Sequence, residues 1–164
     1  MNNSHLRFKL KNECFATPVE QVLKILEFKE VTPVPKAPQF LKGVINWQGS
    51  LLPVIDLNLK LGFTETVLRK ETCILVLEFQ LGSEKSILGC IVDEVKSVMN
   101  IFPEKIIASP SIGEKYQSEL ILGMYPDDEL FIILLDFKKI FESDESLKLS
   151  KNELNETILN KPEQ

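Results

Sequence analysis

The sequence predicts a mainly β protein made of two small barrels packed together, with short helices and a C-terminal tail. One observation is a hairpin pattern over residues 40–57, where two apolar runs flank the polar break at residues 48–50 and Gly49 permits a tight turn. A second observation is that residues 123–137 repeat this layout, with glycine, turn, apolar run and aspartate at the same relative positions. The repeat predicts a doubled β structure.

A third observation concerns the faces of the two predicted hairpins. Apolar residues occupy adjacent positions, as in Val54 with Ile55 and Ile133 with Leu134. Neighbouring residues of a strand point to opposite faces, so a sheet with one wet face would alternate more cleanly. Each hairpin is therefore expected to be covered on both sides, as two small barrels packed face to face would achieve.

The first elements follow from simple patterns. Residues 6–10 alternate apolar and basic side chains, which predicts a half-buried strand, and residues 14–17 are expected to return beside it. Pro18 is suited to a first helical turn and is expected to open a helix over residues 19–26. Residues 32–38 contain three prolines, which predicts an extended connector.

The remaining elements follow the first hairpin. Residues 57–62 predict a short helix that glycine ends, and residues 64–70 are polar and patternless. Strands are expected over residues 72–79, 86–92 and 95–102, then a loop over 103–118, the second hairpin over 120–135 and a short helix over 137–141. We therefore expect one domain over residues 1–142, with two barrel subdomains divided near 63–70.

The tail over residues 143–164 is polar. Leu147, Leu154 and Ile158 stand at spacings of seven and four residues. These spacings suit either a weak amphipathic helix that docks on the body or a frayed end, and both readings stay open.

Composition excludes several classes of function. The chain has 164 residues and a net charge of −5, which argues against a nucleic-acid partner. Three cysteines without a C-x-x-C motif indicate buried free thiols in a reducing cytoplasm, and the only histidine, His5, leaves too few ligands for zinc. Without an apolar signal core or a run of about 20 apolar residues, a cytoplasmic protein with no membrane insertion is expected.

No motif in the sequence points to catalysis or a cofactor. Asp56 and Asp136 each lie at a strand end before a short helix, where a carboxylate caps the first turn. The competing hypothesis is an enzyme that pairs them, or uses Asp93. Glycine-rich phosphate-binding motifs are absent. The sequence favours capping, and we expect no cofactor and no metal.

Several linked motifs resemble the CheW-like domain of bacterial chemotaxis. The central one is Leu-Lys-Gly-Val-Ile-Asn at residues 41–46, followed by Gly49 and by Pro-Val-Ile-Asp-Leu at 53–57. Segments at 15–22, 32–38, 88–95, 121–123 and 133–136 extend the resemblance over about residues 5–142.

The resemblance implies two five-stranded, SH3-like β-barrels and a non-enzymatic adaptor. Such an adaptor couples chemoreceptors to the histidine kinase CheA in arrays at the membrane. It binds the regulatory domain of the kinase by barrel-to-barrel packing. It also binds the cytoplasmic tip of the receptors between its barrels.

The chain departs from the family at two positions. The hairpin turn usually reads Asn-Leu-Arg-Gly, whereas this chain has Gln48 in place of the arginine, and Lys24 stands where the family often carries an acid. An amide cannot form the bidentate pairs of a guanidinium. The departures predict a divergent paralogue with its own set of partners.

The expected partner-binding residues are Val22, Lys24, Gly43, Trp47 and Gln48. Their ordinary structural roles would be a core valine, a solvated lysine, a turn glycine, a core indole and a solvated amide. Trp47 stays open between core and interface, because tryptophan is enriched among interface hot spots. Alternative functions are an adaptor of a related pathway such as pilus movement, a self-assembling array component and, last, a small β hydrolase.

Overall fold

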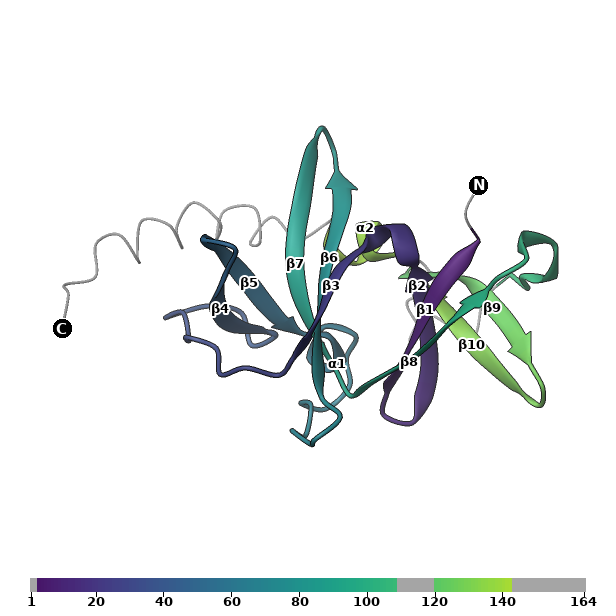
Figure 1. The fold of residues 1–164 in the computed structure, drawn as a ribbon, viewed down its shortest axis with the longest axis horizontal. Coiled ribbons are helices and arrows are strands. Elements are labelled where there is room, and N and C mark those ends of the chain that lie inside the picture. Colours follow the sequence, from purple (N-terminus) through teal and green to yellow (C-terminus); the bar gives the residue numbers. More distant parts are fainter. Residues whose placement is uncertain (1–2, 109–119, 143–164) are drawn as a thin grey trace.

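The protein is described by a computed structural model over residues 3–108 and 120–142, and it consists of two five-stranded sheets (Figure 1). The first sheet has the order β8-β1-β2-β10-β9 and contains β1 (Ser4–Leu10), β2 (Glu13–Pro18), β8 (Glu94–Asn100), β9 (Ile121–Asp127) and β10 (Leu130–Leu135). The second has the order β3-β6-β7-β5-β4 and contains β3 (Val22–Glu27), β4 (Leu41–Trp47), β5 (Ser50–Asp56), β6 (Cys73–Leu81) and β7 (Glu84–Val92). Four short helical segments complete it: η1 (Val19–Gln21), α1 (Leu57–Lys60), η2 (Pro103–Lys105) and α2 (Phe137–Glu142). The expected mainly β fold is confirmed, and the tail over residues 143–164 lies outside the described residues.

The sheets do not separate at residues 63–70, where the sequence predicted a division. The second sheet takes strands from both sides of that segment, and the first sheet combines strands from the two ends of the chain. Two pairings cross the segment: β5 runs parallel to β7, with Val54 opposite Gly89, and β3 runs antiparallel to β6. Residues 63–70 thus form a loop within the second sheet, and the expected boundary is corrected.

The helix expected over residues 19–26 is also corrected. Only η1 is helical, and β3 follows it at once as a strand antiparallel to β6. Leu26 on β3 packs against the core of the second sheet. The strand is favoured because edge pairing and this burial outweigh a weak intrinsic helix preference.

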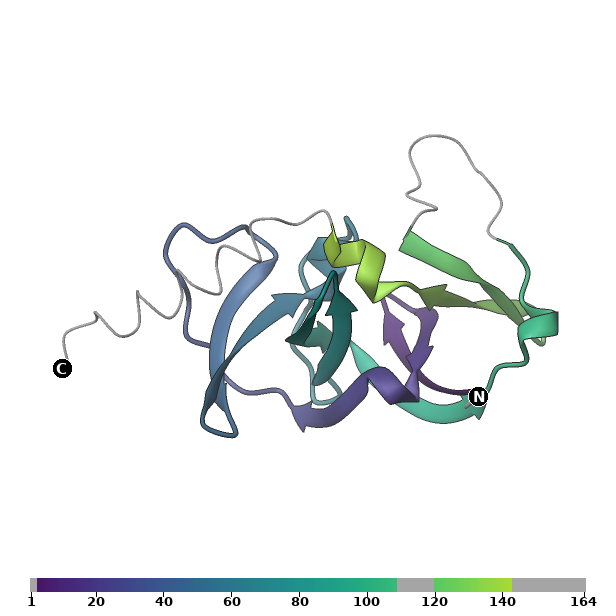
Figure 2. The same ribbon diagram turned by 90° about the horizontal axis from the view of Figure 1, so that it is seen from above.

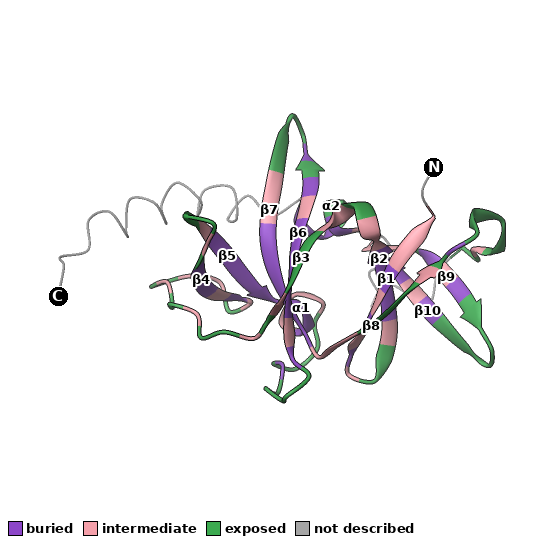
Figure 3. Cartoon of the chain, in the orientation of Figure 1, coloured by how far each residue is buried: buried purple, intermediate pink, exposed green. Residues whose placement is uncertain are grey.

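Each sheet curls around its own apolar cluster. Every strand of the second sheet contributes to one cluster, which contains Ile45, Leu52, Val54, Ile74, Val76 and Ile91 with Leu26 packed against it. The first sheet encloses a smaller cluster made of Ala16, Ile101, Tyr125, Ile132 and Leu134. The figure coloured by burial shows the same division, with buried strand centres and exposed hairpin ends (Figure 3).

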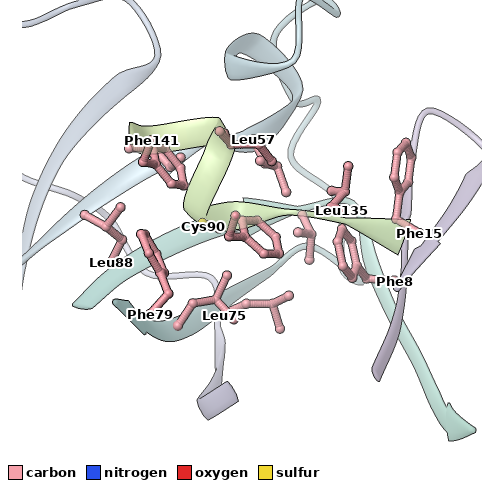
Figure 4. Packing of buried hydrophobic residues seen from close by; sticks show 14 of the residues in the cluster. Phe8, Phe15, Leu57, Leu75, Phe79, Leu88, Cys90, Leu135 and Phe141 are labelled. Atoms are coloured by element: carbon pink, nitrogen blue, oxygen red, sulfur yellow. The ribbon is translucent and has the colours of Figure 1, made fainter. Parts of the chain in front are cut away.

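A third and larger cluster lies between the sheets. Leu75 and Phe79 of β6 belong to it, together with Phe8 and Phe15 of the first sheet and Phe141 of α2 (Figure 4). Because successive side chains of a strand point to opposite faces, β6 lines its own sheet's core on one face and the shared core on the other. α2 lies over the junction of the two sheets (Figure 2). This arrangement explains why neither hairpin alternates cleanly in sequence.

The three cysteines are free, but only Cys90 is fully buried, while Cys14 and Cys73 are half-buried. Burial raises the pKa of all three thiols, most strongly for Cys90. A thiol-specific reagent near neutral pH should therefore label Cys14 and Cys73 slowly and leave Cys90 unlabelled until denaturant is added. Mass spectrometry of peptides from a labelling time course would check this, and early modification of Cys90 in the folded protein would contradict its position in the shared core.

Candidate protein-interaction site

The Asp56 carboxylate is the centre of a buried polar network. It is 1% exposed and caps α1 by accepting hydrogen bonds from the backbone N–H groups of Asn58, at 3.0 Å, and Leu59, at 3.4 Å. Its other donors are the backbone N–H of Thr66, at 2.9 Å, and the Thr66 hydroxyl, at 2.7 Å. The carboxylate therefore fixes both the start of α1 and the loop that follows it.

The network continues to the first sheet. The Asn58 amide nitrogen donates to the Thr66 hydroxyl at 2.7 Å and to the Asp93 carboxylate at 3.2 Å. Asp93 in turn accepts from the backbone N–H of Lys11 at 2.7 Å, in the turn between β1 and β2. These bonds join α1, the end of β7 and the β1–β2 turn, so Asp93 has a structural role.

Asp136 has a simpler position. Its carboxylate accepts one hydrogen bond from the backbone N–H of Lys139, at 3.3 Å, which places it as the cap of α2. The capping interpretation of both aspartates is thereby confirmed. Asp56 has its acceptor atoms occupied by backbone and hydroxyl donors, and this arrangement stabilises the fold.

The turn between β4 and β5 presents Gln48. Gln48 and Gly49 both have positive φ, +52° and +79°, and the Gly49 N–H donates to the Asn46 side chain at 3.1 Å. Two successive positive φ values characterise the hairpin turn whose twist matches that of the flanking strands. Gln48 is exposed at its tip, while Trp47 is half-buried and packs against the core of the second sheet. Trp47 thus has one part of its indole in the core and another part at the surface.

Gly43 does not lie on the surface. It is buried with φ of +151°, and a Cβ built on it would lie 2.0 Å from the backbone oxygen of Thr32. Thr32 and Val44 exchange two backbone hydrogen bonds of 2.9 Å at this point. Because Gly43 has no side chain, the connector that contains Thr32 can pass directly against the backbone of β4.

The β3 strand forms an exposed edge of the second sheet. Lys24 is exposed between Leu23 and Ile25, whose exposed fractions are 41% and 43%, and Val22 is half-buried against the shared core. Two exposed aliphatic side chains that flank a lysine on an unpaired strand edge form a surface suited to protein contact. We call Leu23, Lys24 and Ile25 the β3 edge.

The five residues expected to bind partners fall into two groups. Gly43, Trp47 and Gln48 belong to the β4–β5 hairpin, while Val22 and Lys24 belong to β3, and these elements lie at opposite ends of the strand order. Sequence reasoning missed Leu23 and Ile25, because a helix was expected over residues 19–26. The signal that was available is the four branched aliphatic residues that surround Lys24 between Val22 and Leu26, which suit a strand.

Two further findings bear on the kind of site. Within residues 3–108 and 120–142, no group of three or more histidine, cysteine, aspartate or glutamate side chains is placed to hold a metal ion. The helices of the same residues are all too short or too polar to cross a bilayer.

Comparison with known proteins gives a consistent result. The model of the CheW-like domain family matches residues 4–145. The chain is 30% identical over 140 residues to chemotaxis protein CheW of Klebsiella aerogenes, covering 85% of this chain and 82% of that protein. It is 30% identical over 139 residues to protein FrzA of Myxococcus xanthus, covering 83% of each. Among solved structures, the scaffolding protein TtCheW of Thermoanaerobacter tengcongensis matches with a TM-score of 0.76 at 26% identity, covering 88% of this chain and 90% of that one.

Proposed function

Because this chain belongs to the CheW-like domain family of chemotaxis scaffold proteins, which are not enzymes, we propose that it couples chemoreceptors to a CheA-type histidine kinase in signalling arrays. The observation that carries the proposal is the family match across both sheets, from residue 4 to residue 145. The protein would act in the cytoplasm and be recruited to receptor arrays. Signal would pass by contact, as changes at its interfaces shift the kinase between activity states.

The partner-binding surface that we propose comprises the β3 edge and the tip of the β4–β5 hairpin. Lys24 and Gln48 are both exposed and can contact a partner without any change of fold. The exposed aliphatic side chains of Leu23 and Ile25 would supply the apolar part of such a contact. Val22 and Gly43 would act indirectly, since Val22 packs on the shared core and Gly43 is buried.

The replacement of the usual arginine by Gln48, and of the usual acid by Lys24, would determine which partners are accepted. Lys24 adds a positive charge to an exposed edge, and a like charge on a partner costs affinity there. The proposed partners are the regulatory domain of a CheA-type kinase and the cytoplasmic tip of a chemoreceptor. An adaptor of a related pathway is the alternative.

Two exposed substitutions test this surface. Lys24→Glu and Gln48→Gly should each weaken binding of the cognate kinase regulatory domain about fivefold or more, because an exposed interface side chain is altered. Glycine suits the positive φ of residue 48, so that variant removes the side chain without strain. Titration calorimetry measures the affinities, and thermal unfolding should remain near that of the unmodified protein.

The matched control is Lys85→Glu, which makes the same charge change at a residue whose side chain is 71% exposed on β7. It should leave kinase binding unchanged. The kinase and receptors are first identified by capture from the native cytoplasm with the full chain. If neither is recovered, the proposed function is wrong. If Lys85→Glu weakens binding as much as Lys24→Glu, the proposed surface is wrong.

A further inference from the structure

The parallel pair β2 and β10 is open at one end. The two strands pair only at Ile133 with Phe15 and at Leu134 with Ala16, although β10 begins at Leu130 and β2 at Glu13. The β1–β2 and β9–β10 hairpins diverge from this short pairing toward their turns (Figure 1). The first sheet is therefore split where two of its inner strands should continue side by side.

A groove of about 890 Å³ occupies this split. Its apolar lining includes Met124, Leu130 and Phe131, and the exposed fractions of Leu130 and Phe131 are 77% and 46%. Leu130 is the most exposed large apolar side chain among those described. Apolar surface of this kind, framed by polar residues, marks interaction sites on soluble proteins.

The rim of the groove is acidic. Glu13, Asp127, Asp128 and Glu129 all line it, and Lys9 is its single cationic lining residue. Arg7 lies 3.8 Å from the Asp127 carboxylate and offsets that charge in part. The other three acids have no ion pair among the described residues, so the groove carries a net negative charge that favours a basic occupant.

Strand edges form both walls of the groove. At the start of β10, Phe131 pairs with Pro126 of β9 on one side, and its other side faces the groove. At the start of β2, Cys14 pairs with Lys9 of β1, and its other side faces the groove as well. Unpaired strand edges bind extended segments through backbone hydrogen bonds.

We propose that this groove binds an extended protein segment in which apolar and basic residues alternate, and that the segment adds as a strand in the split between β2 and β10. Alternation places apolar side chains on Leu130 and Phe131 and basic side chains toward the acidic rim. The site lies on the first sheet, away from the β3 edge and the β4–β5 hairpin, and does not depend on the proposed function.

The first test uses peptides and the full chain without mutation. A fluorescent peptide of about eight residues that alternates leucine with lysine should bind, as measured by anisotropy. Replacing its lysines by glutamate should weaken binding about tenfold or more, because the rim is acidic. Methylating the backbone nitrogens of alternate residues should weaken binding in either register, since successive amides of an inserted strand face opposite walls of the groove. Equal binding of the glutamate peptide, or no effect of methylation in either register, would overturn the proposal.

The second test uses matched protein variants. Leu130→Ser should weaken peptide binding about tenfold, whereas Leu122→Ser, on β9 outside the groove lining and 57% exposed, should not. Glu13→Gln with Glu129→Gln should weaken binding and flatten its salt dependence, whereas Glu84→Gln at the start of β7 should do neither. If Leu122→Ser weakens binding as much as Leu130→Ser, the groove is not the site. If light scattering instead shows dimers that Leu130→Ser dissociates, a second copy of the chain occupies the groove, and the proposal of a separate extended segment is wrong.

Discussion

Replacing Gly43 with alanine is expected to lower the free energy of unfolding by about 3–5 kcal/mol, since backbone strain and overpacking add at this position. The added Cβ would lie 2.0 Å from the Thr32 oxygen and 2.6 Å from the Thr32 carbonyl carbon, and real side chains do not approach backbone so closely. The connector would have to move, and the two Thr32–Val44 hydrogen bonds would be lost. Equilibrium unfolding in urea, followed by Trp47 fluorescence, measures the change.

Gly49→Asn is the control for Gly43→Ala. Gly49 also has a positive φ, but a Cβ there meets nothing within 4 Å, and asparagine tolerates this conformation. This control should cost only about 1 kcal/mol or less. An equal loss for both variants would show that backbone conformation, and not the contact with Thr32, makes glycine necessary at position 43.

This expectation changes how Gly43 variants are interpreted in binding experiments. Gly43 was expected on the partner-binding surface, yet it is buried below the connector. A Gly43 variant that fails to bind partners would therefore report a displaced hairpin or an unfolded protein. Gln48→Gly and Lys24→Glu, which alter exposed side chains, are the variants that test the surface itself.

Replacing Asp56 with alanine is expected to lower the free energy of unfolding by about 3 kcal/mol, and to do so through the buried network. The carboxylate accepts from Asn58, Leu59 and Thr66, and without it the donors from Thr66 and the first turn of α1 are left buried and unpaired. The loop over residues 63–70 should loosen together with α1. Urea unfolding measures the loss, and amide hydrogen exchange at Thr66 should increase.

Asp136→Ala is the matched control for the Asp56 variant. Asp136 caps α2 with a single side-chain bond of 3.3 Å and is only half-buried, so its loss should cost about 1 kcal/mol. Asp56→Asn should fall between the two, because an amide keeps one acceptor oxygen. Equal losses for Asp56→Ala and Asp136→Ala would contradict the larger role of the buried network.

The hairpin tip could be predicted from the sequence because its signal is local. Gly49 permits the turn and Asn46 accepts a hydrogen bond from the Gly49 N–H, while the flanking apolar runs specify the strands. The β3 edge could not be predicted from the sequence, because the five residues from Val22 to Leu26 suit a helix as well as a strand. Only pairing with β6, which lies far along the chain, makes Leu23 and Ile25 exposed residues of an edge.

The groove on the first sheet could not be predicted from the sequence for a similar reason. Glu13 and Leu130 are more than a hundred residues apart, and β2 and β10 meet through only two pairs of residues. Nothing in either hairpin alone indicates that the strands diverge beyond this contact. The split follows from the way the two hairpins are held against the shared core.

The sequence by itself determined the elements whose information is short-range: both hairpins, the caps of α1 and α2, and the doubly apolar strands that require two covered faces. Tertiary structure alone decided how those elements combine, including the parallel pairing of β5 with β7 and the sharing of the first sheet between the two ends of the chain. The physical reason is the separation in sequence between the interacting residues, since turns and caps are stabilised by bonds between near neighbours in the chain. Strand order and the burial of Gly43 depend instead on contacts between segments that the chain brings together only when it folds.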